Sequence, residues 1–217
     1  MSNIFIIGAT GGVGSRLGPM LISAGHKVTG LHRKLEQADR LREAGIQPCH
    51  GDIMEMTAND LTNASQGHDV IVFSAGAAGS GLDRTSAIDG NGPIKAIEAA
   101  KANGIPRLYL VSVFMDALRD QPRKEGFEHY MKSKRQADNA LVASDLKWVI
   151  LRPGTLVSED GNGLVNANRA IPYGKVARGN VAATLAVLID TPDIYREIIE
   201  LTDGNTPVRD AVGSLLR

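Results

Sequence analysis

The chain has 217 residues, with 24 Lys and Arg against 24 Asp and Glu, so its formal net charge is zero. This balance offers no basic surface to nucleic acid and no cationic face to anionic lipid, so neither is expected as a partner. The single cysteine, Cys49, excludes an internal disulfide and favours a reducing compartment. No apolar run reaches the ~18 residues of a membrane span, and the N-terminus lacks the features of a secretory signal. We therefore expect a soluble, cytoplasmic protein.

Short apolar runs alternate with segments of helical spacing along the whole chain. The expected strands, in chain order, cover residues 3–7, 27–31, 46–50, 69–73, 107–111, 147–151 and 197–201. The expected helices cover residues 12–24, 35–44, 57–66, 91–103, 125–144 and 179–190. Such alternation predicts right-handed βαβ units and a parallel sheet. The fold class is therefore α/β: a single Rossmann-like, doubly wound domain over residues 1–217, with a mostly parallel sheet of about seven strands and helices on both faces.

The glycine-rich segment GATGGVG (8–14) joins the first expected strand to the first expected helix. Gly8 suits a tight turn, Gly11 lets backbone approach a phosphate, and Gly14 allows close packing of the helix on the strand. A glycine-rich turn without a ligand would have the same composition, but the strand before and the helix after favour a pyrophosphate at the helix N-terminus. The residues expected to contact a dinucleotide here are Gly8, Thr10, Gly11, Gly12, Val13 and Gly14.

The end of the second strand, His32-Arg33-Lys34, bears on the choice of cofactor. A protein that selects NAD usually has an acid here for the ribose hydroxyls, whereas the nearest acid, Glu36, is already in the expected helix. Arg33 and Lys34 instead suit a 2′-phosphate. We therefore expect NADP(H) to be preferred over NAD(H); the alternative is that both cations are simply solvated at a helix start.

Further cofactor contacts are expected where later strands end. Asp52 and Ile53 follow the third strand, and Asp52 could accept a hydrogen bond from the adenine amino group or merely cap the next turn. Small residues after the fourth strand would allow close approach to the ribose and pyrophosphate, although any tight loop tolerates them. The remaining expected contacts, after the fourth and sixth strands, are Ser74, Ala75, Gly76, Pro153 and Gly154.

The expected helix 125–144 carries Tyr130 and Lys134, four residues apart on one face. Lys134 falls in the middle of an apolar stripe, where a charge is costly without a partner. One explanation is a local ion pair with Asp138, one turn further on. The other is catalytic: an adjacent ammonium favours the phenolate and lowers a phenol pKa from ~10, so that Tyr130 could exchange a proton with a substrate oxygen. Ser112, at the end of the fifth strand, would face the same crevice.

The sequence resembles the short-chain dehydrogenase/reductase superfamily, most closely its atypical, single-domain NAD(P)H-binding group of NmrA-like and flavin-reductase-like proteins. The segments that carry the resemblance are GATGGVG, GDI (51–53), SAGA (74–77), IDGNGPIKAIEAA (88–100), YLVS (109–112), YMKSK (130–134), LRPG (151–154) and LTDGNTP (201–207). The resemblance implies that Tyr130, Lys134 and Ser112 are catalytic and that Lys134 also holds the nicotinamide ribose. Two departures are Asp89, where extended relatives have Asn, and Phe114, in a region where relatives carry serines.

The leading functional hypothesis is an NADP(H)-dependent oxidoreductase for a small carbonyl, quinone or similar acceptor. A cofactor-binding sensor without turnover is the first alternative. A sugar-nucleotide epimerase or dehydratase is less favoured, because such enzymes add a large substrate domain and little chain follows Gly154. Residues 155–178 are expected to form a substrate lid. A monomer and a small homo-oligomer both remain open, and no metal site is expected.

Overall fold

The central element of the computed structural model, which describes residues 1–118, 122 and 124–216, is a sheet with the strand order β11-β8-β10-β6-β5-β4-β1-β2-β3. Its parallel strands are β1 Asn3–Ile7, β2 Lys27–His32, β3 Gln47–His50, β4 Val70–Phe73, β5 Arg107–Val111, β6 Lys147–Pro153 and β10 Glu197–Asp203. The seven expected strands are therefore confirmed, each within a residue or two of its expected bounds.

The sheet is larger than expected, because two antiparallel strands extend one edge. β8 Leu164–Asn168 pairs with β10, and β11 Thr206–Pro207 pairs with β8, so that nine strands lie within the described residues. A separate two-stranded parallel sheet joins β7 Thr155–Val157 to β9 Lys175–Ala177. These additions come from the segment after β6, so the expectation of about seven strands was too low.

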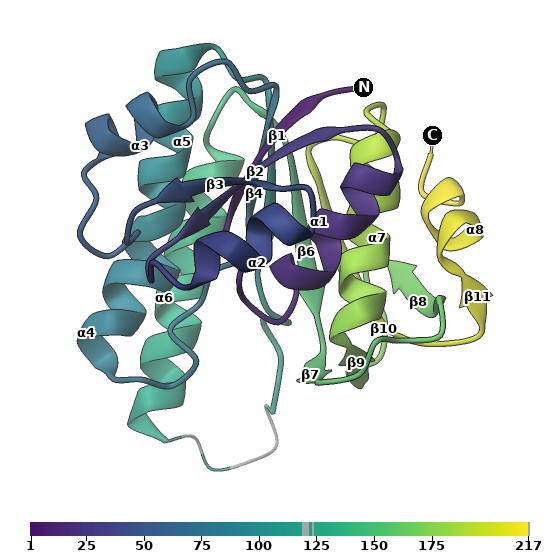
Figure 1. Cartoon of the computed structure of the whole chain (residues 1–217). Helices are drawn as coiled ribbons and strands as arrows, with labels where there is room; N and C mark the ends of the chain where they lie inside the picture. The colour runs from purple at the N-terminus through teal and green to yellow at the C-terminus, as the bar shows by residue number, and fades with distance from the viewer. Residues whose placement is uncertain (119–121, 123, 217) are drawn as a thin grey trace.

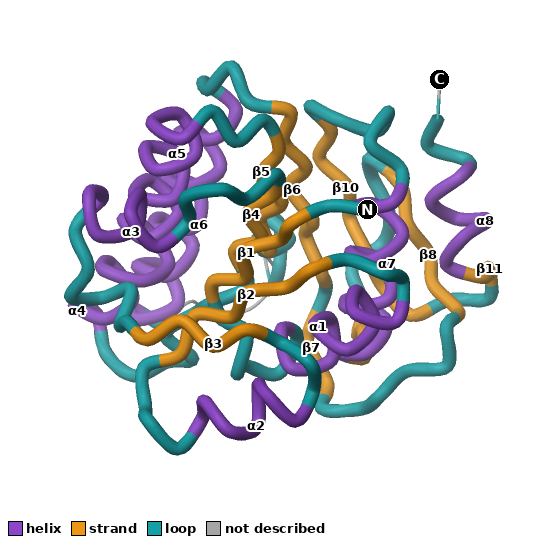
Figure 2. The backbone as a smooth tube through the Cα atoms, turned by 45° about the horizontal axis from the view of Figure 1, so that its top comes forward, coloured by secondary structure: helices purple, strands orange, loops and turns teal. Residues whose placement is uncertain are grey.

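Helices cover both faces of the sheet, as expected (Figures 1 and 2). One face carries α1 Gly14–Ser23, α2 Gln37–Glu43, α7 Arg178–Asp190 and α8 Val208–Gly213. The other carries α3 Ala58–Ala64, α5 Gly92–Asn103 and α6 Glu125–Val142. A short helix α4 Leu82–Thr85 and a π-helical segment η1 Ser86–Asn91 lead directly into α5. None of the described helices combines the length and the apolar character needed to cross a bilayer.

The alternation of side chains along β1 explains the continuous apolar run of the sequence. Ile4 and Ile6 belong to the core beneath α1 and α7, whereas Phe5 and Ile7 belong to the core beneath α3, α5 and α6. All four side chains are fully buried. A central parallel strand covered on both faces needs an apolar residue at every position. The two cores fix the strands, and thereby bring their carboxyl ends to one edge.

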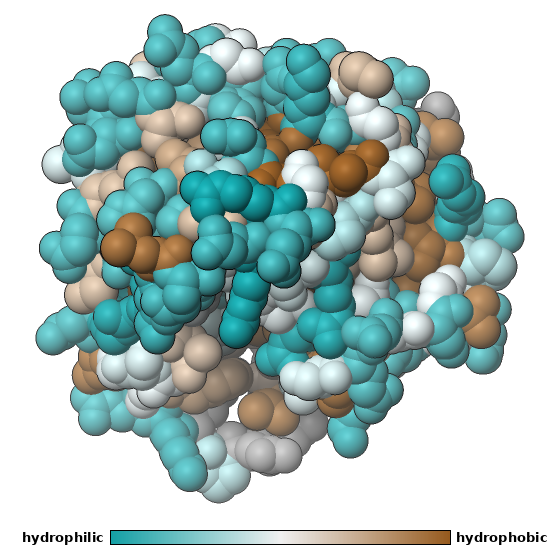
Figure 3. Space-filling view, in the orientation of Figure 1, coloured by the Kyte–Doolittle hydropathy of each residue, from teal (hydrophilic) through white to brown (hydrophobic). Residues whose placement is uncertain are grey.

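That edge is the place where open α/β sheets bind ligands. The segments that follow β1, β2, β3, β4, β5 and β6 all emerge there. In the space-filling view the lower edge of the molecule, where Figure 1 shows α4, α6 and β7, is hollowed (Figure 3).

Candidate functional site

The glycine loop between β1 and α1 is shaped by three close approaches of backbone. Gly8 has φ +95°, and a Cβ there would lie 2.5 Å from Ala75 N. A Cβ on Gly14 would collide with the carbonyl oxygen of Gly8, so the absence of a side chain lets α1 pack against β1. Gly11 is exposed, and a Cβ there would meet only the Gly8 oxygen, at 3.2 Å. A larger side chain at position 11 would therefore extend into the space outside the loop.

The loop presents unused backbone donors. The N–H groups of Gly12, Val13 and Gly14 donate to no oxygen in the described part of the chain, although the next three residues of α1 are hydrogen-bonded. Thr10, Gly11 and Gly12 are exposed. Free N–H groups at a helix start, with the positive end of the helix dipole, suit an anion. The residues present thus fit a pyrophosphate.

Two cations stand at the end of β2. Arg33 and Lys34 are exposed, Lys34 Nζ lies 3.7 Å from Glu36 Oε1, and Arg33 has no carboxylate partner among the described residues. Their backbone is held by imidazoles: His50 Nε2 lies 3.2 Å from Arg33 O, and His32 Nδ1 lies 3.0 Å from Lys34 O. The turn is therefore fixed while the charged ends stay in solvent.

Asp52, which follows β3, already has a structural role. Its Oδ1 accepts the backbone N–H of Met54 at 3.0 Å, which is the turn-capping alternative for this residue. Its other oxygen has no hydrogen bond within the described residues. Ile53 is 7% exposed and packs in the core beneath α5. The position is compatible with an adenine contact through Asp52 alone.

The segment after β4 lies directly against the glycine loop. Ser74 donates its backbone N–H to Ile7 O at 2.8 Å, and Ala75 is the neighbour that requires glycine at position 8. A Cβ on Gly76 would lie 3.2 Å from Asp89 Oδ1, so its small size lets the chain pass a buried carboxylate. The small residues here are needed by the fold itself, whether or not a cofactor is bound.

Pro153 and Gly154 are buried at the end of β6. The Gly154 N–H donates to Leu201 O at 2.9 Å, and a Cβ on Gly154 would collide with the carbonyl of Gly174. Close packing therefore accounts for the glycine, and its N–H is already used. The expected cofactor contact at this pair has no free donor to support it.

Lys134 lies at the centre of the site, between Asp89, Val111 and Tyr130. Its side chain is 5% exposed, and its Nζ lies 3.1 Å from Asp89 Oδ1 and 3.2 Å from the carbonyl oxygen of Val111. The same ammonium lies 5.7 Å from the centre of the Tyr130 ring. The second oxygen of Asp89 accepts the N–H of Ala77 at 2.9 Å. The buried charge is thus paired and hydrogen-bonded, as burial requires.

The local Lys134–Asp138 ion pair considered from the sequence does not form. Asp138 Oδ2 instead accepts Arg152 Nη2 at 2.8 Å and Nε at 3.1 Å. Burial raises the pKa of Asp138, against the lowering effects of Ser112, Arg152 and Lys134. Ser112 Oγ and Asp138 Oδ1 are both buried, and neither has a well-aligned hydrogen bond in the described structure. The Ser112 hydroxyl therefore lies beside the Asp138 carboxyl group, where it lowers the pKa of that acid without a well-aligned hydrogen bond.

The pKa of Tyr130 is raised, not lowered as the sequence suggested. Burial is the largest cause, and the nearby carboxylates of Asp89 and Asp138 act in the same direction. Lys134 does lower the pKa, but the other effects outweigh it. For Lys134 itself, burial lowers the pKa while Tyr130 and Asp89 raise it, and the net direction is up. At neutral pH the pair is therefore a neutral phenol beside an ammonium.

Aromatic side chains lie near Tyr130. Phe127 packs on it with ring centroids 6.4 Å apart, and Phe114 meets Tyr173 edge-on at 5.4 Å. Tyr173 Oη lies 2.6 Å from Thr155 Oγ1. Residues from α6, from the segment after β5 and from residues 155–178 thus converge on the same edge of the sheet. The sequence singled out Phe114 but gave no signal for Tyr173.

Asp89 is the site residue whose role the sequence missed. It was noted as a departure from the Asn of extended relatives and as part of the loop 76–90, expected to face the lid, but nothing linked it to Lys134. The link depends on η1, where the wider π-helical turn precedes α5 and where Asp89 is only 1% exposed. Single-turn π segments often mark functional sites. The available signal in the sequence was an acidic residue between an isoleucine and a glycine, in the segment IDGNG (88–92).

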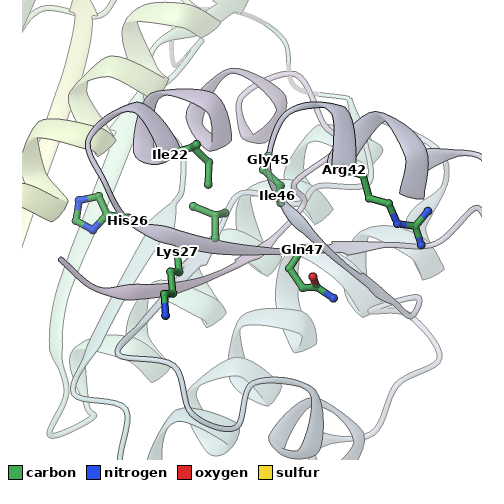
Figure 4. A pocket seen from close by; sticks show the side chains of 8 residues that line it. Ile22, His26, Lys27, Arg42, Gly45, Ile46 and Gln47 are labelled. Atoms are coloured by element: carbon green, nitrogen blue, oxygen red, sulfur yellow. The ribbon is translucent and has the colours of Figure 1, made fainter.

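Two surface hollows lie away from this constellation. One, of about 520 Å³, lies by the amino ends of β2 and β3 (Figure 4). Its lining residues are Ile22, His26, Lys27, Val28, Arg42, Gly45, Ile46 and Gln47. The other, of about 430 Å³, lies on the outer face of α6. Neither contains a residue expected to bind cofactor or substrate.

The fold and the glycine loop define a nucleotide-binding α/β protein of the Rossmann type. The chain belongs to the NAD(P)H-binding family, whose profile matches residues 8–192.

Relatives of similar length support this assignment. YhfK of Bacillus subtilis, described as an uncharacterised sugar epimerase, is 35% identical over 214 residues, covering 98% of this chain and 99% of that protein. A Bacillus halodurans structure described as a candidate NAD-dependent epimerase/dehydratase is 32% identical, with a TM-score of 0.90 and coverage of 99% and 100%. The oxidoreductase ylbE of Lactococcus lactis is 27% identical, with a TM-score of 0.85 and coverage of 98% and 96%.

Proposed function

We propose that the chain is an NADP(H)-dependent oxidoreductase of the short-chain dehydrogenase type, acting on a small carbonyl, quinone or similar acceptor. The observation that carries this proposal is Lys134: a buried ammonium held by Asp89 beside Tyr130, at the carboxyl end of the sheet. A structural lysine is cheaper on the surface, so a buried and paired one beside a phenol favours a functional role.

Each residue of the constellation has a distinct part. Bound NADP(H) supplies or accepts the hydride. Tyr130, a neutral phenol at neutral pH, donates a proton from its Oη to the substrate oxygen during reduction. Lys134 has three donors, of which one is bonded to Val111 O while Asp89 balances the charge, so a donor remains for a ribose hydroxyl. Ser112 Oγ, which is buried beside Asp138 without a well-aligned hydrogen bond, holds the substrate carbonyl.

Residues 155–178 serve as the substrate lid in this proposal. Tyr173 lies against Phe114 and is among the groups that raise the pKa of Tyr130, so this segment borders the reacting groups. A lid of this kind excludes water from the crevice and strengthens electrostatic interactions inside it. Cofactor selection falls to Arg33 and Lys34, whose charged ends are exposed to solvent at the end of β2 and suit a 2′-phosphate.

The test is cofactor oxidation by the purified protein. NADPH consumption is measured against quinones, flavins, aldehydes and ketones, with binding of NADPH measured in parallel by calorimetry. Turnover of at least one acceptor class is expected. Tight NADPH binding with no turnover across the panel would favour a cofactor sensor instead, for which the incomplete serine region around Phe114 is the supporting feature.

A sugar epimerase is the second candidate, because one relative is described as a sugar epimerase and another as an NAD-dependent epimerase/dehydratase. The match to YhfK, which is described as a sugar epimerase, covers 99% of that protein. An epimerase should retain its cofactor through purification and convert a sugar nucleotide without net consumption of NADPH. Assaying UDP-sugars alongside the acceptor panel separates the two functions.

A further inference from the structure

Arg178, the first residue of α7, lies across the glycine loop. A Cβ built on Gly12 would be 2.5 Å from Arg178 Cδ and 2.7 Å from its Nε. Glycine at position 12 thus makes room for the arginine side chain. The contact brings together two helix starts, because α1 and α7 run side by side on the same face of the sheet (Figure 2).

The guanidinium of Arg178 has no carboxylate partner among the described residues. Its Nη1 donates to Ser158 Oγ at 2.6 Å, and it is half-buried. Arg16, on the other side of the same loop, differs: its Nε pairs with Asp160 at 2.9 Å, and its Nη1 donates to Gly12 O at 2.9 Å. A guanidinium carries five N–H donors, so Arg178 retains several that the protein does not use.

The unused donors of Arg178 stand beside the unused donors of the loop, the N–H groups of Gly12, Val13 and Gly14. Such a grouping suits a bridging phosphate, because guanidinium and phosphate match in charge and geometry. We propose that Arg178 is a further cofactor-binding residue that contacts the pyrophosphate of the dinucleotide. The proposal rests on dinucleotide binding at the glycine loop, but not on turnover.

This role differs from that of Arg33. The pyrophosphate is common to NADPH and NADH, whereas the 2′-phosphate belongs to NADPH alone. Arg178→Met, which keeps the apolar stem, should therefore weaken both cofactors by the same factor, about ten-fold to a hundred-fold. Arg178→Lys should lose less, since it keeps the charge. Gly12→Ala should weaken both cofactors too, because the added Cβ displaces the arginine stem, and its effect should not add to that of Arg178→Met.

The experiment is calorimetric titration of NADPH and NADH into these variants, with melting temperature as the check on folding. Two matched controls test a merely structural role. Arg16→Met removes an arginine that touches the same loop but is paired with Asp160, and Ser158→Ala removes the hydrogen bond from Arg178 without removing its charge. Both controls should bind within about two-fold of wild type, on the scale of a surface interaction.

Equal losses for the two cofactors in Arg178→Met, at an unchanged melting temperature, would support the proposal even if no substrate is ever turned over. Unchanged affinity, a loss confined to NADPH, or an equal loss in Ser158→Ala would each overturn it. Should Arg178→Met fold poorly, Arg178→Lys and Gly12→Ala give the same comparison. A wild type that binds neither cofactor would overturn the proposal together with dinucleotide binding itself.

Discussion

Individual side chains at the site are held by charges from distant parts of the chain. Lys134 on α6 pairs with Asp89 on η1, while Asp138, one turn along the same helix, pairs with Arg152 on β6. Removing one partner of a buried ion pair typically costs ~3–5 kcal/mol, because the other charge is left without compensation. The two pairs therefore fix α6 against both its neighbours, and hold Tyr130 at the edge of the sheet.

Tyr130→Phe should lower turnover of a carbonyl substrate by about 10²–10⁴-fold, the usual contribution of a general acid. NADPH affinity and melting temperature should stay close to wild type, because only a hydroxyl is removed and no hydrogen bond to it is present in the described structure. Steady-state kinetics with calorimetry and a thermal melt would check this. A quinone or flavin that needs no proton from the enzyme should be reduced at the normal rate, which makes it the internal control.

Lys134→Met provides the companion measurement. It should lower both turnover and NADPH affinity, and also the melting temperature, since it leaves Asp89 buried without a cation. The double variant Lys134→Met/Asp89→Asn should recover much of the melting temperature without recovering affinity. Full affinity in Lys134→Met would show that the lysine is structural only.

Arg33→Ala should weaken NADPH about ten-fold or more and leave NADH nearly unchanged, because a charge-assisted contact to the 2′-phosphate is worth ~1.5–3 kcal/mol. Arg33 has no carboxylate partner in the described structure, so its removal disturbs little else. Titration of both cofactors into both proteins gives the selectivity. Equal losses for the two cofactors, or a wild type that prefers NADH, would contradict the prediction.

The burial of Lys134 could be predicted from the sequence, but its partner could not. Helical spacing puts Lys134 on the apolar stripe regardless of the rest of the fold. The choice between Asp138 and Asp89 depends on where η1 sits against α6, which local spacing does not encode. The same holds for the direction of the Tyr130 pKa, since the sequence contains the lysine four residues away but not the degree of burial that outweighs it.

At the scale of elements, strands and helices were predictable where apolar residues recur at a regular spacing along a buried segment. β1, β4 and β5 are apolar at nearly every position, and α6 shows a clear stripe. The missed strands β7, β9 and β11 are two or three residues long, too short for any period to show. β8, with the sequence LVNAN, exposes alternate residues at the sheet edge and does not stand out from a polar loop.

At the β1–α1 junction, substitution of one glycine should affect cofactor binding, and substitution of another should affect the stability of the fold. Gly11→Val should give a folded protein that no longer binds dinucleotide, because its side chain would extend into the space outside the loop. Gly14→Ala should instead destabilise the fold by about 1–3 kcal/mol, since its Cβ would collide with the backbone of Gly8. Denaturant unfolding and calorimetry on both variants test the contrast. Retained binding in Gly11→Val would mean that the loop is only a turn.

At the scale of the whole molecule, several buried or partly buried groups share one direction of pKa shift. Burial raises the pKa of Cys49 above 9.0 and that of Tyr109 above 10.0. The pKa of Tyr130 is raised above 10.0 by burial, and that of Lys134 above 10.5, where Tyr130 and Asp89 outweigh the lowering effect of burial. Each folded group holds its proton more tightly than the unfolded chain does. Their stabilisation is therefore complete below the ordinary pKa values and is lost as pH rises through the raised ones.

The melting temperature should accordingly vary little on account of these groups between pH 7 and 9, then fall with increasing steepness above about pH 10. Between its ordinary and its raised pKa, each group removes up to ~1.4 kcal/mol of the free energy of unfolding per pH unit, which is large beside a typical total of ~5–15 kcal/mol.

Tyr109→Phe is the diagnostic variant. Its lost hydrogen bond to Leu188 O, 3.1 Å long, should lower the melting temperature at pH 8. The gap to wild type should close toward pH 11, because the variant no longer has a buried phenol to ionise. Parallel curves for the two proteins up to pH 11 would show that Tyr109 does not contribute to the alkaline loss of stability.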